Sequence, residues 1–138
     1  MMMADALVSR IRQEVPDWRR HLHQNPELSL DEQDTARFVQ ETLESRPGLD
    51  VTRPTAPSVM ARLHTGRAGK VLAIRAAIDA LPIQEENDFE FRAQRPGAMH
   101  ACGHDAHTAM LPSTAKVLSA MADQLAGEVR FLFQQAEE

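Results

Sequence analysis

Apolar residues recur along the chain with two different periods, and the change of period separates helices from strands. Between residues 5 and 23 they return every three or four positions, which is the spacing of one helical face; they are Leu7, Ile11, Val15, Trp18 and Leu22. Pro16 lies inside this pattern, so the sequence predicts a break or kink near Val15. We expect Trp18 to anchor the core rather than to contact a ligand.

Two further segments have a helical period. The first is expected to begin at Ser29, because its hydroxyl can cap a helix whose Glu32 completes a capping box. Its apolar face contains Ala36, Phe38, Val39 and Leu43, and Arg46-Pro47-Gly48 ends it. The second runs from Asp105 to about Gln124, with Pro112 as a residue that a helix interior accommodates poorly.

Four shorter segments are typical of strands. Leu49–Thr52 is a weak candidate, whereas Val59–His64 alternates between apolar and polar residues. Lys70–Ala76 is almost continuously apolar, which predicts a central strand buried on both faces. Glu128–Phe133 alternates and then becomes apolar, as a further strand would. The charge-rich residues 83–96 have no clean period and predict a loop, so the whole pattern indicates an α/β fold.

Composition narrows the class of protein. The chain has 138 residues, of which 43% are hydrophobic and 25% charged, and this suits one globular domain. A net charge of -5 with scattered Lys and Arg argues against a nucleic-acid-binding surface. The single cysteine excludes an intrachain disulfide. We expect no membrane span and no signal peptide, and therefore a cytoplasmic protein.

The richest stretch of metal donors is Met99–His107, which contains the only cysteine and three of the six histidines. His100, Cys102 and His104 alternate, so an extended segment would place them on one face, and Gly103 permits a sharp bend. A thiolate and an imidazole suit zinc or another late first-row ion, and an added carboxylate extends the choice to manganese. The alternative is a polar loop that enters a helix.

Acidic residues follow two of the predicted strands. Asp79 comes directly after the apolar strand, where open α/β sheets place their sites, and it could bind a metal or orient a ligand imidazole. Glu137 and Glu138 follow the last strand, and one could coordinate a metal while the other acts as a base. The alternatives are a turn aspartate and a solvated acidic tail. We interpret His21 and His23 as hydrogen-bonding residues at a helix C-terminus rather than as metal ligands.

Four blocks, in order, resemble the M20 metallopeptidase family: Arg20–Ser29, Arg75–Pro82, Met99–His107 and Phe133–Glu138. The similarity is to its amidohydrolase branch, which includes hippurate hydrolase, N-acyl-amino-acid amidohydrolases and auxin-conjugate hydrolases. The resemblance implies a three-layer α/β/α sandwich with a mainly parallel mixed sheet. It also implies metal-dependent hydrolysis of N-acyl amino acids, hippurate-like or N-acetylated. Residues 1–138 would be the N-terminal part of the catalytic domain, without the lid domain.

The resemblance also implies roles for individual residues. Cys102, His104 and Glu138 match metal ligands, Glu137 matches the general base, and Asp79 matches the aspartate beside the centre. The metal would be a divalent ion such as Mn, Zn, Co or Ni. The partner would be a small N-acyl amino acid, with neither nucleic acid nor membrane.

The chain also departs from the family pattern. Ala77 stands where an aspartate is usual, Pro112-Ser113 replaces Leu-Gly, and Gln135 replaces a proline. His100 and His107 belong to the motif but are expected to have supporting roles only. Family members are much longer, and two further histidine ligands lie downstream in them.

Three protein ligands would leave an open, weakly held metal site, so activity of this chain by itself is left open. Two other interpretations remain at this point. One is a non-catalytic metal-binding or interaction fragment that associates, also as a homo-oligomer, through an apolar edge left by the last strand. The other is a domain without a site, in which Cys102 is a buried apolar thiol.

Overall fold

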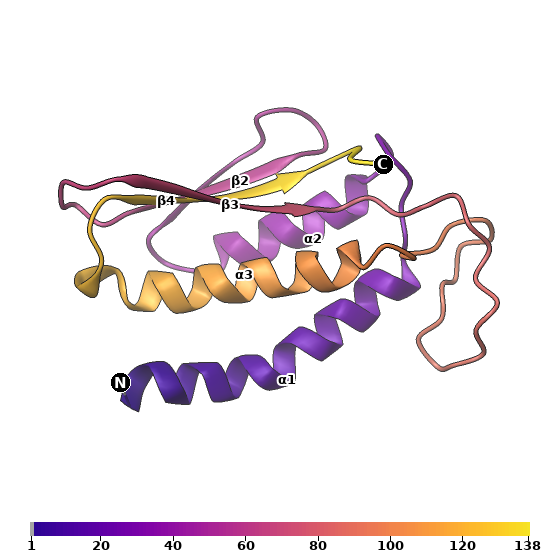
Figure 1. Cartoon of the computed structure of the whole chain (residues 1–138), viewed down its shortest axis with the longest axis horizontal. Helices are drawn as coiled ribbons and strands as arrows, with labels where there is room; N and C mark the ends of the chain where they lie inside the picture. Colours follow the sequence, from indigo (N-terminus) through magenta and orange to yellow (C-terminus); the bar gives the residue numbers. More distant parts are fainter. Residues whose placement is uncertain (1) are drawn as a thin grey trace.

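Three α-helices lie on one face of a four-stranded sheet (Figure 1). The structure is a computed structural model that describes residues 2–138. The helices are α1 (Met2–Gln24), α2 (Gln33–Glu44), α3 (His104–Ala120) and the short 3₁₀ helix η1 (Ala122–Gln124). The strands are β1 (Leu49–Thr52), β2 (Val59–His64), β3 (Val71–Ala77) and β4 (Glu128–Gln134).

The sheet has the strand order β1-β2-β4-β3. β1 with β2 and β2 with β4 are antiparallel, whereas β3 with β4 is parallel. The predicted α/β fold with a mixed sheet is therefore confirmed. Only one of the three strand pairings in residues 2–138 is parallel, which is fewer than a mainly parallel sheet requires. Of the three predicted layers, these residues form two, the sheet and one layer of helices.

Two predictions about the position of strands are wrong. β3 is not central but lies at an edge of the described sheet, and its Val71 and Leu72 are 55% and 56% exposed. β4 is not an open edge, because it lies between β2 and β3. An apolar run shows that a strand has two apolar faces, but it does not encode the order in which strands pair.

The core lies between the sheet and the helices. Alternate residues of β2 and β4 point toward the helices and are buried, and the largest of them are Leu63, Phe131 and Phe133. Burying each of these side chains contributes about 1.5–3 kcal/mol to folding. The rigid layer formed in this way fixes the ends of β3 and β4, where the candidate site lies.

The helix ends show where local signals were misleading. The sequence predicted a break or a kink near Val15. α1 continues through Pro16 without a break, and Figure 1 shows that α1 changes direction along its length, as a kink would produce. α2 begins at Gln33 and is not capped by Ser29; instead the carboxylate of Glu27 accepts hydrogen bonds from the backbone N–H groups of Asp34 (3.1 Å) and Thr35 (2.5 Å). Among the described helices, none has the length and apolarity that crossing a membrane requires.

Candidate metal centre

Cys102, His104 and Glu138 form a cluster in which one donor atom of each lies within 4.8 Å of the others. This is the one such group of three or more potential metal ligands in residues 2–138. Gly103 has a φ of 90°, a left-handed conformation that lets the loop turn directly into α3, whose first residue is His104. Glu138 arrives from the segment after β4. The structure therefore brings together the three predicted metal ligands.

Asp79, on the segment after β3, fixes the orientation of the His104 ring. The Nδ1 atom of His104 lies 2.9 Å from the backbone oxygen of Asp79 and 3.1 Å from its Oδ1 atom. Because both neighbours are acceptors, we assign the ring proton to Nδ1. The lone pair of Nε2 is then free, and it faces Glu137 at 3.6 Å and Glu138 at 3.9 Å. This is the orienting contact predicted for Asp79.

The other carboxylate oxygen of Asp79 holds the remaining parts of the cluster. Its Oδ2 atom accepts hydrogen bonds from the hydroxyl of Ser29 (2.8 Å) and the backbone N–H of Glu138 (2.9 Å). Burial alone would raise the pKa of Asp79, but these two hydrogen bonds, with its own backbone and His104, lower it below the usual value. Asp79 is therefore an anion that positions two of the candidate ligands.

A turn at Ala136, which has a left-handed φ of 50°, sets the direction in which the chain carries Glu137 and Glu138. Non-glycine residues adopt this conformation only when their surroundings hold it. The buried carboxylate of Glu32 does so by accepting the Ala136 N–H at 2.7 Å. Burial raises the pKa of Glu32. The Glu137 side chain is 35% exposed, so it reaches both the cluster and solvent. The role of Glu32 was missed, since its sequence position indicated a capping residue.

The thiol of Cys102 is exposed, which excludes the interpretation as a buried apolar thiol. A hydrogen bond with Glu138 raises the pKa of this thiol, with further contributions from desolvation and the neighbouring carboxylates. The thiol therefore holds its proton in the metal-free protein. A divalent cation that binds there must displace that proton.

The remaining motif histidines lie outside the cluster. His100 is buried, neither of its ring nitrogens has a hydrogen-bond partner among the described residues, and burial lowers its pKa to about 4. It is therefore neutral. The ring of His107 lies 6.3 Å from that of His104. Of the three alternating donors of this motif, only Cys102 and His104 belong to the group of potential metal ligands.

His23 belongs to a separate buried cluster. Its Nδ1 lies 2.8 Å from the Oδ2 atom of Asp105, and its Nε2 lies 3.0 Å from the Oε1 atom of Glu85. Arg19 donates to the same oxygen of Asp105 at 2.9 Å. Burial would raise the pKa of Glu85, but hydrogen bonds from the backbone of Ala93 and from His23 lower it. His23 thus has tertiary partners, where the sequence suggested only helix-terminal hydrogen bonds.

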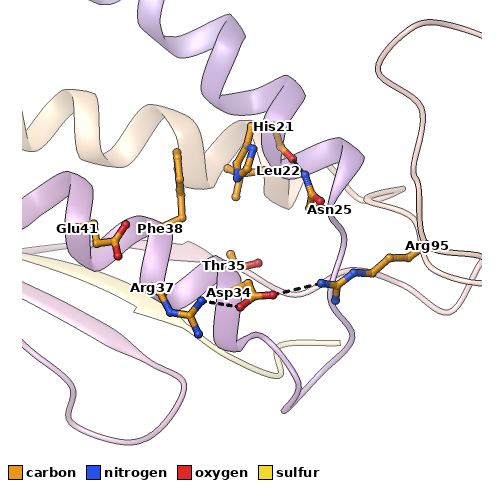
Figure 2. A pocket seen from close by; sticks show the side chains of 9 residues that line it. All are labelled: His21, Leu22, Asn25, Asp34, Thr35, Arg37, Phe38, Glu41 and Arg95. Atoms are coloured by element: carbon orange, nitrogen blue, oxygen red, sulfur yellow. Dashed lines mark hydrogen bonds and ion pairs between the residues drawn. The ribbon is translucent and has the colours of Figure 1, made fainter.

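A hollow of about 400 Å³ lies between the end of α1 and α2, and Figure 2 shows the residues that line it. Arg37 and Arg95 both form ion pairs with Asp34, at 3.0 and 3.3 Å. None of its lining residues is a predicted site residue. The candidate chemistry therefore lies at the Cys102–His104–Glu138 cluster and not in this hollow.

Comparisons with known proteins address the family. The model of the peptidase family M20/M25/M40 matches residues 73–138. An N-acyl-L-amino acid amidohydrolase from Geobacillus stearothermophilus is 60% identical over 132 residues, which is 96% of this chain and 36% of that protein. The chain belongs to the M20 family. A second relative, an N-acetyl-L-cysteine deacetylase of Bacillus subtilis, is 43% identical over 95% of this chain and 32% of its own length.

Solved structures agree with the M20 assignment. A dinuclear metal-binding M20 peptidase from Bacillus subtilis superposes with a TM-score of 0.86 at 40% identity, over 94% of this chain and 36% of that chain. A structure from methicillin-resistant Staphylococcus aureus gives a TM-score of 0.92 at 39% identity, over 99% and 36%. The M20 chain described here thus spans about a third of the length of the curated relatives it matches.

Proposed function

We propose that the protein is a metal-dependent amidohydrolase that cleaves N-acyl amino acids, and that residues 1–138 are the N-terminal part of its catalytic domain, without the lid. The observation that carries this proposal is the cluster of Cys102, His104 and Glu138 next to the partly exposed Glu137. The activities for which the 60% and 43% identical relatives are named support the substrate class. Hippurate-like substrates and a cytoplasmic location remain predictions from the sequence.

The donor set fits a divalent cation. A thiolate, an imidazole nitrogen and a carboxylate oxygen are ligands of borderline ions such as Zn, Co, Ni and Mn. Cys102, His104 and Glu138 would hold the ion, which when bound would polarise the amide carbonyl and acidify a water molecule. Asp79 supports the fit, because it leaves the Nε2 lone pair of His104 free toward the cluster.

The chain's own residues supply the proton transfers. Glu137 takes a proton from the attacking water as the C–O bond forms. The same carboxyl group then gives the proton to the leaving nitrogen as the C–N bond breaks. The products are a carboxylate and a free amino acid. Asp79 does not touch the substrate in this proposal; it keeps His104 and Glu138 in position.

A second candidate function is supported by β3. Its edge carries the exposed residues Val71 and Leu72, and within the described residues it has a strand partner on one side only. A fragment with such an edge could bind metal without catalysis and associate with another chain or with a second copy.

Glu137→Gln separates the two candidates. In the chain supplied with Mn, Co or Zn, we expect this change to lower the rate of N-acyl amino acid hydrolysis by about 10²–10⁴-fold while metal binding persists. Glu86→Gln, in the exposed part of the loop 83–96, is the matched control and should leave the rate unchanged. An undiminished rate in Glu137→Gln rejects Glu137 as the base. Absence of turnover in the unchanged chain with all three metals rejects catalysis by this chain and favours the second candidate.

A further inference from the structure

One buried carboxylate beside the candidate metal centre has no part in the proposed chemistry. Glu32 precedes α2, its side chain is fully buried, and its carboxylate accepts the Ala136 N–H at 2.7 Å, across 104 positions of sequence. We propose that Glu32 is a positioning residue for the base: through the turn at Ala136 it sets where Glu137 lies, without contacting metal or substrate. The proposal rests on the proposed function and goes further by assigning a residue to the placement of the base.

Two buried carboxylates hold the backbone on either side of Glu137. Glu32 accepts the N–H of the residue before it, Ala136, and Asp79 accepts the N–H of the residue after it, Glu138, at 2.9 Å. Asp79 thereby holds a candidate metal ligand, whereas Glu32 holds the turn that leads into the base. A change at Glu32 is therefore expected to displace the base more than the metal ligands.

The connection from which Glu32 reaches the site is itself held in an unusual conformation. Leu30 has a left-handed φ of 72° although its side chain is 65% exposed, so burial does not explain the conformation. A bulky residue keeps such a conformation only where surrounding contacts hold it. Those contacts lie on both sides of Leu30, since Ser29 donates to Asp79 and Glu32 accepts from Ala136. The connection is thus fixed against the site at two points.

Only one oxygen of Glu32 makes the contact. Its Oε1 atom accepts the Ala136 N–H, whereas its Oε2 atom is buried and has no hydrogen-bond partner among the described residues. Burial is the largest influence on the pKa of Glu32 and raises it. The contact therefore requires an acceptor at the position of Oε1 and does not require a negative charge.

This requirement reverses the usual order of two conservative substitutions. Glu32→Gln removes the charge but keeps a carbonyl oxygen at the same reach, with its NH₂ group in the place of Oε2. Glu32→Asp keeps the charge but ends one carbon–carbon bond earlier, which withdraws the acceptor by about 1.5 Å. We therefore expect the shorter acid, and not the neutral amide, to release Ala136.

The kinetic test measures kcat and KM for hydrolysis of N-acetylalanine, together with the affinity for Zn. A displacement of a reacting group by about 1 Å can lower the rate about 10²-fold, so we expect Glu32→Asp to lower kcat by this factor. KM and Zn affinity should stay unchanged, because Asp79 still holds Glu138. Glu32→Gln should keep the kcat of the unchanged chain, as should the control Asp31→Asn at the exposed neighbouring residue.

Hydrogen exchange measured by NMR tests the contact without metal or substrate. In Glu32→Asp the Ala136 amide should exchange about tenfold faster, which corresponds to the loss of one hydrogen bond, whereas in Glu32→Gln its rate should not change. The Glu138 amide, which Asp79 accepts, should exchange at the same rate in both variants. Glu32→Met, which has a similar length and no comparable acceptor, replaces Glu32→Asp in both tests if that variant fails to fold.

Several results would overturn the positioning role of Glu32. An unchanged kcat in Glu32→Asp would do so, as would an equal loss in Glu32→Gln, which would make the charge the important property. A fall in Zn affinity as large as the fall in kcat would show a general structural role instead. Absence of turnover in the unchanged chain rejects the proposed function and the catalytic consequence with it, whereas equal Ala136 exchange in all chains rejects the contact itself.

Discussion

Two buried histidines at the same end of the sheet differ in one respect. Both ring nitrogens of His23 face carboxylates, those of Asp105 and Glu85, at 2.8 and 3.0 Å. In His104 only Nδ1 has close acceptors, which are the backbone oxygen and the Oδ1 atom of Asp79. Its Nε2 faces the carboxylates of Glu137 at 3.6 Å and Glu138 at 3.9 Å, which is beyond ordinary hydrogen-bond length.

The difference separates a structural histidine from one that can bind a ligand. A ring such as that of His23, whose two nitrogens both lie against acceptors, has no nitrogen left to bind a metal. A ring whose one proton is held by a carboxylate presents a free lone pair. His104 and Asp105 are adjacent in the first turn of α3. His104 belongs to the candidate metal cluster, whereas Asp105 contacts His23 in the separate buried cluster.

The largest expected effect is on stability at His23. His23→Ala leaves the buried carboxylates of Asp105 and Glu85 without their shared partner, which should cost about 3–5 kcal/mol of unfolding free energy. His104→Ala should cost only about 1 kcal/mol in the metal-free protein, because Asp79 keeps its bonds from Ser29 and Glu138. Urea unfolding followed by circular dichroism measures both.

The control for this comparison is His64→Ala. His64 has an exposed side chain that pairs with Glu128 at 3.1 Å, and such surface pairs contribute about 0–1 kcal/mol. If His23→Ala lowers the unfolding free energy no more than His64→Ala does, His23 does not stabilise the fold. The proposed difference between His23 and His104 is then wrong.

The next effect concerns metal affinity. Asp79→Asn keeps the size of the side chain but removes the charge that fixes the His104 proton on Nδ1. We expect metal affinity to fall about 10–100-fold, as for other residues that orient a metal ligand. Titration calorimetry with Zn measures this. Asp123→Asn, at an exposed residue of helix η1, is the control. An affinity in Asp79→Asn equal to that of the control would contradict the positioning role.

The smallest effect is at the surface, on the pH dependence of stability. Hydrogen bonds from Arg62 and then Arg130 lower the pKa of Glu128 from 4.5 to about 2. Its contribution is therefore present above about pH 4.5 and is lost as the pH falls toward 2. Glu128→Gln should be less stable than the unchanged chain at neutral pH, and the gap should close between pH 4.5 and 2. A gap that does not change with pH would show that the charge of Glu128 is not involved.

The local sequence pattern predicted the helices and strands better than it predicted the order of the strands or the cap of α2. The predicted strand Val59–His64 coincides with β2, because alternation with a period of two is a local property. The order of the strands and the cap of α2 depend on contacts between residues far apart in sequence. Glu27 displaced Ser29 as the cap because the hydroxyl of Ser29 bonds to Asp79, fifty positions away.

The residues of the candidate site likewise fall into those that a local sequence pattern reveals and those that depend on contacts between distant segments. Cys102 and His104 were evident from a short motif, and Asp79, Glu137 and Glu138 were candidates because they follow predicted strands. The family resemblance then implied a role for each of them. Glu32 and the His23–Glu85 contact were not evident, because a buried carboxylate has no local pattern that reveals its partner. The metal-ligand roles of Cys102, His104 and Glu138 remain a proposal until metal binding is measured.

The most direct test is to measure binding of Co²⁺ by the chain. Equilibrium dialysis gives the affinity, and ultraviolet absorption reports the bond between the thiolate and cobalt. The account predicts that the unchanged chain binds the ion with this absorption, and that Cys102→Ser loses the absorption and binds more weakly. Binding of equal strength in Cys102→Ser, or no binding by the unchanged chain, would contradict the proposal that Cys102, His104 and Glu138 form a metal centre.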